Sequence, residues 1–133
     1  MSATLTERRK ADRQKMADRV HAIAAHHGAT VTRENEGECF LGPRAVLITI
    51  EAARGLRVGI DFDGASPQPD VHVLAWHIAP GSDARLSPRF GNINPYHQRK
   101  CTTVAYGIDA LCRELADKLT MARDGSAFDI EQA

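Results

Sequence analysis

The residues best suited to binding an anion lie close together between positions 96 and 103. They are Tyr96, His97, Arg99, Lys100, Thr102 and Thr103. Arg99 offers a planar fork of donors to a phosphate or carboxylate, and Lys100 adds a second positive charge. Tyr96 and His97 can stack on a nucleobase or hydrogen-bond to a sugar. The set therefore predicts an anion- or ligand-binding site, with nucleic acid or another phosphate-bearing ligand as the partner.

These residues are expected at a junction between a long loop and a helix. We expect Pro80–Cys101 to be irregular and the last helix to open at Thr102–Thr103. A long irregular connection in a compact domain commonly binds a ligand or forms an ordered loop. The first turn of a helix favours anions, because it carries unpaired N–H groups and partial positive charge. The alternative is a structural junction, in which Phe90, Ile93 and Tyr96 pin a solvated basic loop to the core.

A pair of carboxylates offers a second chemistry. Asp61 and Asp63 flank one residue of an expected strand, so they share a face, as ligands of a divalent cation would. The string Asp61-Phe62-Asp63-Gly64 resembles the nucleophile motif of haloacid-dehalogenase-type phosphatases over these four residues. Those enzymes have a large doubly wound domain and further lysine and acidic motifs that this chain lacks. We expect both aspartates to be solvated, on the face away from the apolar row.

The cysteines and histidines lack the spacing of a metal or catalytic site. The cysteines are odd in number and are expected to be reduced thiols: Cys39, Cys101 and Cys112. No Cys-x-x-Cys or His-Glu-x-x-His motif is present. Cys101 beside the basic pair at a helix start would have a lowered pKa, with His97 as a nearby base, but no orienting acid is evident. We therefore assign no catalytic residue, metal or cofactor, and expect a non-enzymatic binding module.

Two helices flank the expected strands. The first is predicted from Thr4 or Thr6 to about His27, with Gly28 ending it. The last carries an apolar stripe from Val104 to Ala122 and ends near Gly125. The strands are expected at Ala29–Arg33, Glu38–Leu41, Arg44–Ala52, Leu56–Asp63 and Val71–Ile78. Val71–Ile78 is apolar on both faces, which indicates a central or doubly covered strand.

The register of one hairpin can be predicted from its apolar pattern. A three-residue loop, Ala53-Arg54-Gly55, pairs Ile50 with Val58 and Ile48 with Ile60, which collects the apolar side chains on one face. The same register also pairs Val46 with Phe62 and sets Glu51 against Arg57. A two-residue turn would instead mix apolar and charged groups, so we expect the three-residue loop.

The order of elements predicts an α+β fold. We expect a two-layer sandwich, in which an antiparallel meander of about four strands carries the N- and C-terminal helices on one face (α-β-β-β-β-α). Parallel crossovers are disfavoured because no helix separates the strands. One domain is expected over residues 1–133, with fraying at 1–10 and 126–133.

Composition places further limits on partners. The chain of 133 residues is 43% apolar and 26% charged, and its formal net charge is zero. General attraction to nucleic acid or an anionic membrane is therefore not expected, and any such contact has to be local. Residues 71–100 provide a local excess of four bases over one acid. No apolar run approaches the roughly 20 residues of a membrane span, so a cytoplasmic location without a membrane partner is expected.

Self-association is the alternative function. The strand at 71–78 is apolar on both faces, and we expect Leu47 and Val73 to need cover on the outer face of the sheet. A second copy of the chain or another protein would supply that cover. The protein would then be an interaction or regulatory accessory protein, acting as a homodimer through the outer sheet face.

Overall fold

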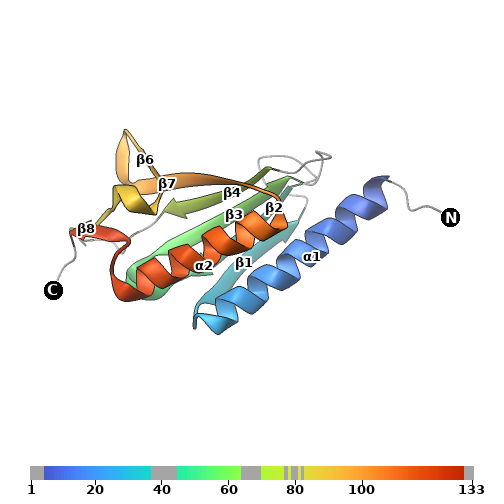
Figure 1. The fold of residues 1–133 in the computed structure, drawn as a ribbon, viewed down its shortest axis with the longest axis horizontal. Helices are drawn as coiled ribbons and strands as arrows, with labels where there is room; N and C mark the ends of the chain where they lie inside the picture. Colours follow the sequence, from blue (N-terminus) through green and yellow to red (C-terminus); the bar gives the residue numbers. More distant parts are fainter. Residues whose placement is uncertain are drawn as a thin grey trace.

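The computed structural model describes residues 5–36, 45–63, 70–76, 78, 81 and 83–130. These residues form a small fold of mixed helix and strand, with two long helices and antiparallel sheets (Figure 1). In chain order the elements are α1 (Leu5–His26), β1 (Thr30–Glu36), β2 (Ala45–Glu51), the 3₁₀ helix η1 (Ala53–Gly55), β3 (Arg57–Asp63), β4 (Asp70–Trp76), β5 (Arg85–Leu86), the 3₁₀ helix η2 (Pro88–Phe90), β6 (Asn92–Asn94), β7 (His97–Tyr106), α2 (Ile108–Asp124) and β8 (Phe128–Ile130). The strand predicted at Glu38–Leu41 lies outside the described residues.

The strands divide between two sheets. Six of them pair antiparallel in the order β1-β2-β3-β4-β7-β6, while β5 and β8 pair with each other in a small second sheet. The expected single meander of about four strands is therefore not confirmed. Strand β4 has neighbours on both sides, as its two apolar faces predicted, but it is not the last strand before the final helix.

The β2–β3 hairpin has the predicted register. Ile50 lies opposite Val58 and Ile48 opposite Ile60, and all four side chains are buried. Further along the ladder, Val46 pairs with Phe62 and Glu51 with Arg57. The loop spans Ala53–Gly55, where Arg54 (φ 60°) and Gly55 (φ 78°) both adopt left-handed backbone angles. The predicted loop length is thus confirmed.

The core lies between the six-stranded sheet and the two helices. Helix α1 contacts β1 and β2, helix α2 contacts β4 and β7, and the helices contact each other (Figure 1). The side chains buried at this interface include Met16, Val20, Ile48, Ile60, Val73, Leu111, Leu115 and Leu119. Each fully buried aliphatic side chain contributes about 1.5–3 kcal/mol to folding. Val73 is fully buried in this core, so the expectation that it needs cover on the outer face is wrong.

The segment before the last helix differs most from the prediction. Within Pro80–Cys101, the described residues form β5, η2, β6 and the start of β7, where an irregular loop was expected. Thr102–Thr103 continue strand β7, and α2 begins only at Ile108, after Gly107 with a φ of 91°. The β-branched run of Thr102, Thr103 and Val104 suits a pleated strand better than a helix, because branching at Cβ restricts the side chain in a helix.

Neither helix in the described part of the chain combines the length and the apolar character needed to cross a membrane.

Candidate functional site

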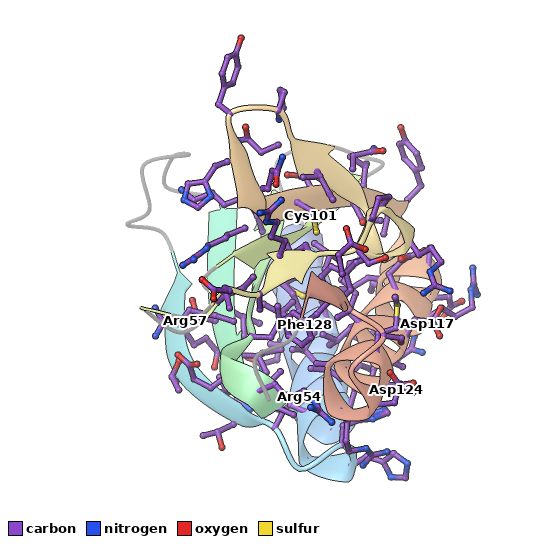
Figure 2. The ribbon with its side chains drawn as sticks, turned by 90° about the vertical axis from the view of Figure 1, so that its left-hand side faces the viewer. Arg54, Arg57, Cys101, Asp117, Asp124 and Phe128 are labelled. Carbon is purple, nitrogen blue, oxygen red and sulfur yellow. The ribbon has the colours of Figure 1, made fainter. Side chains whose placement is uncertain are left out.

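A β-hairpin formed by β6 and β7 carries most of the predicted site residues. It stands at the top of Figure 2, with Cys101 near its base. Asn94 pairs with His97 across the tip, and Pro95 holds the second position of the turn, where its fixed φ is favourable. The Tyr96 N–H donates to Asn94 Oδ1 at 2.8 Å. Hydrogen bonding within the turn therefore stabilises the tip, while the Tyr96 side chain is 96% exposed.

A bulge in β7 accounts for the position of the basic residues. Ile93 pairs with Cys101 and Asn94 with His97. These partners are adjacent on β6 but are separated by the three residues 98–100 on β7. Bulges of this kind redirect side chains and occur often beside binding sites. Within the bulge, the Arg99 N–H donates to His97 Nδ1 at 3.2 Å. That bond places the proton of a neutral His97 imidazole on Nε2.

The hairpin and the segment around β5 enclose an open cleft of about 690 Å³. Its lining combines two cations, one carboxylate, two rings and an amide: Asp83, Arg85, Tyr96, His97, Gln98 and Arg99. Arg85 Nη1 donates to Gln98 Oε1 at 3.4 Å, which links β5 to the bulge. The cleft therefore gathers two guanidinium groups and two rings from segments more than ten residues apart.

The structure brings only part of the predicted set together. Tyr96, His97 and Arg99 line the cleft. Lys100 is exposed in the bulge and does not line it, and Thr102 lies further along β7. Thr103 Oγ1 is buried and has no hydrogen-bond partner among the described residues. Because no helix begins at these threonines, the predicted contribution of a helix N-terminus is wrong.

Three lining residues were absent from the predicted set. Asp83 and Arg85 reach the cleft because β5 pairs with β8 and contacts β7. Gln98 reaches it through the bulge. The one sequence signal was the excess of bases over residues 71–100, which includes Arg85 but does not place it beside Arg99.

The thiol of Cys101 is not activated. Cys101 lies in β7 and is 3% exposed. Burial raises its pKa to about 11, from an ordinary value of 9.0, although Lys118 acts in the opposite direction. A thiol with this pKa remains protonated at neutral pH, so the lowered pKa considered from the sequence is wrong.

Asp61 on β3 is buried. Asp61 is only 9% exposed, in contrast to the solvation expected for it, and the side chain of Asp63 lies outside the described part. Among the described residues, no group of three or more His, Cys, Asp or Glu side chains is arranged to hold a metal ion. The cleft is therefore the best candidate site in the described part of the chain.

Comparison of this chain with protein-family models, curated proteins and solved structures finds no match.

Proposed function

We propose that this protein is a non-enzymatic binding module of the cytoplasm that holds single-stranded nucleic acid by one of its phosphates. The phosphate lies in the cleft between β5 and the β6–β7 hairpin. Arg85 and Arg99 bind it, while Tyr96 and His97 stack on the bases or sugars beside it. Free buried thiols at Cys101 and Cys112 support a reducing compartment.

The observation that carries this proposal is the presence of two arginines and two rings in one open cleft. A guanidinium binds phosphate through two parallel N–H bonds, and a hydrogen bond to a charged group contributes about 1.5–3 kcal/mol. Stacking of a base on an aromatic side chain adds about 1–3 kcal/mol, independent of sequence. Tyr96 can stack without prior rearrangement, because its ring is almost fully exposed.

The charge of the lining indicates the kind of anion. Arg85 and Arg99 contribute two positive charges and Asp83 one negative charge, which gives a net +1 from these three side chains. This balance suits the single charge of a phosphodiester better than a dense polyanion, because Asp83 repels a second anionic group in the same cleft. Lys100, exposed on the bulge, adds attraction as the strand approaches.

Binding of a fluorescein-labelled single-stranded oligonucleotide, followed by anisotropy, tests the proposal. Arg99→Gln and Arg85→Gln should each weaken binding by roughly tenfold, the equivalent of one lost charged hydrogen-bond pair. Arg113→Gln makes the same charge change at an exposed site on α2 and serves as the matched control. Affinity should also fall steeply with salt. Equal losses in all three variants, or binding that persists at about 0.5 M salt, would contradict a defined phosphate site.

Self-association is the second candidate function. Two apolar side chains on β7 are exposed: Val104 (41%) and Tyr106 (76%). They alternate along the strand with the buried Cys101 and Ala105, so they lie on the face away from the helices. Sedimentation velocity would detect a dimer, and Tyr106→Glu should convert it to a monomer. A monomer in the unmodified protein at all concentrations would exclude this candidate.

A further inference from the structure

A second, smaller cleft adjoins the first. It has a volume of about 320 Å³ and is lined by Arg85, Leu86, Pro88, Ile93, Gln98 and Asp129. Arg85 and Gln98 therefore line both clefts. Both volumes fall in the range of roughly 300–1,000 Å³ that is typical of small-ligand sites. The two clefts form one bipartite site.

The lining of the second cleft differs chemically from that of the first. Leu86, Pro88 and Ile93 give it an apolar side, which the first cleft lacks, and Leu86 also belongs to the buried core. Asp129, on strand β8, supplies a carboxylate, which accepts hydrogen bonds and repels anions. The second cleft therefore suits an uncharged, apolar group that carries hydrogen-bond donors, and not a second phosphate.

A single hydrogen bond joins the two residues that line both clefts. Arg85 Nη1 and Gln98 Oε1 are 3.4 Å apart, and both side chains are exposed, so their hydrogen bond is weak. A phosphate in the first cleft offers Arg85 a stronger, charge-assisted partner. Gln98 then has its amide available for a group in the second cleft. Occupation of the two clefts is thereby linked through one pair of side chains.

We propose that the two clefts together hold one nucleotide unit, with its phosphate at Arg85 and Arg99 and its base in the second cleft. Asp129 favours bases that carry an amino group, because its carboxylate accepts from that group. Cytosine offers such a donor, whereas uracil presents a carbonyl oxygen in its place, which the carboxylate repels. This inference rests on the proposed function and adds to it a selection among bases.

The test compares oligo(C) with oligo(U) of equal length in the anisotropy assay. The unmodified protein should bind oligo(C) more tightly by roughly fivefold to tenfold, as expected for one discriminating base contact. Asp129→Asn should bring the ratio close to one, because an asparagine amide can also donate to the uracil carbonyl. Asp117→Asn is the matched control on α2 (Figure 2) and should leave the ratio unchanged. In a competition assay, cytidine monophosphate should bind more tightly than uridine monophosphate, which would show that the preference does not require a nucleic-acid strand.

Three outcomes separate this inference from the proposed function. If Arg99→Gln weakens binding but the unmodified protein binds both oligonucleotides equally, the phosphate site stands and the base site is overturned. A preference for oligo(C) that persists in Asp129→Asn also overturns the role of Asp129. If Arg99→Gln binds as tightly as the unmodified protein, the proposed function fails, and the bipartite site fails with it.

Discussion

Lys118 Nζ donates a hydrogen bond to the carbonyl oxygen of Phe90 at 2.6 Å. Both residues are 2% exposed, and the ammonium lies 4.6 Å from the centre of the Phe90 ring. Glu114 Oε2, at 3.7 Å, supplies the counter-charge. This buried contact ties α2 to η2, the segment that leads from the second cleft into the β6–β7 hairpin.

We expect Lys118→Met to lower the free energy of unfolding by about 1–3 kcal/mol. Methionine approximates the volume of the side chain, but it leaves the Phe90 carbonyl without its donor inside the core. Urea denaturation of the variant and the unmodified protein measures the difference. Equal stability would mean that the cost of burying the ammonium cancels its hydrogen bond, as occurs for some buried ion pairs.

The same lysine should make the free energy of unfolding depend on pH in the alkaline range. Burial is the main cause that lowers the pKa of Lys118 below its ordinary value of 10.5. The unfolded chain therefore binds this proton more tightly, and stability rises with pH from the folded pKa up to about 10.5. Because Cys101 titrates in an overlapping range with the opposite effect, the quantity to follow is the unfolding free energy of the unmodified protein minus that of Lys118→Met, and this difference should rise with pH over the range. The same slope in both proteins would exclude Lys118 as its source.

Close packing at Gly91 should make this position intolerant of a side chain. A Cβ atom there would lie 2.7 Å from Thr103 Oγ1 and 3.3 Å from Cys101 Sγ. We expect Gly91→Ala to cost about 1–3 kcal/mol of stability, as for other overpacked sites. In a Thr103→Ala background, which removes the nearer atom, the cost should shrink. A cost independent of Thr103 would show that the clash is not the cause.

The Cys101 thiol should be inert in the folded protein. With Cys39 and Cys112 replaced by serine, iodoacetamide at pH 8 should react with Cys101 only as fast as the protein unfolds, because burial raises the thiol pKa to about 11. The unfolded thiol loses its proton first, so Cys101 lowers stability as the pH rises from 9.0 toward 11. Labelling at the rate of a free thiol, without denaturant, would contradict this burial.

An ion pair between the helices should add acid-sensitive stability. Arg19 Nη1 lies 2.6 Å from Asp109 Oδ1, and this hydrogen bond lowers the pKa of Asp109 below its ordinary value of 3.8. The stabilising effect is therefore complete above about 3.8 and disappears as the pH falls through the lowered value. Asp109→Asn should be slightly less stable than the unmodified protein at pH 7 and equally stable at strongly acidic pH. A difference that persists in acid would point to another cause.

The β2–β3 hairpin could be predicted because its sequence carries all the information locally. Only one register places Ile48 and Ile50 beside Ile60 and Val58, and the loop contains a glycine where a left-handed residue is required. The first helix is also encoded by a local sequence pattern, and it begins and ends close to the predicted positions. Elements defined by short-range patterns were therefore accessible from the sequence.

The last helix shows how a local pattern can mislead. Val104 continues the helical spacing of Ile108 and Leu111, so the predicted helix began too early. Gly107, with its left-handed φ, separates the strand from the helix, and the burial of Cys101 and Ala105 follows the period of a strand. The branched residues Thr102, Thr103 and Val104 favour a strand, whereas the prediction placed the start of the helix at them.

The cleft itself depends on contacts that no local pattern encodes. Strand β5 has two residues and forms by pairing with β8, more than 40 residues later. That pairing and the contact of β5 with β7 bring Arg85 beside the bulge that carries Gln98 and Arg99. The sequence could indicate basic residues of the right type, but their partners in space follow from tertiary pairing.

The most direct measurement is an NMR titration of the ¹⁵N-labelled protein with inorganic phosphate and then with a single-stranded oligonucleotide. We expect phosphate to shift the amide signals of Asp83, Arg85 and residues 97–99, which surround the first cleft. The oligonucleotide should shift these signals further and add those of Ile93 and Asp129. Shifts concentrated on α1, or spread evenly over the exposed basic residues, would contradict a phosphate site between β5 and the β6–β7 hairpin.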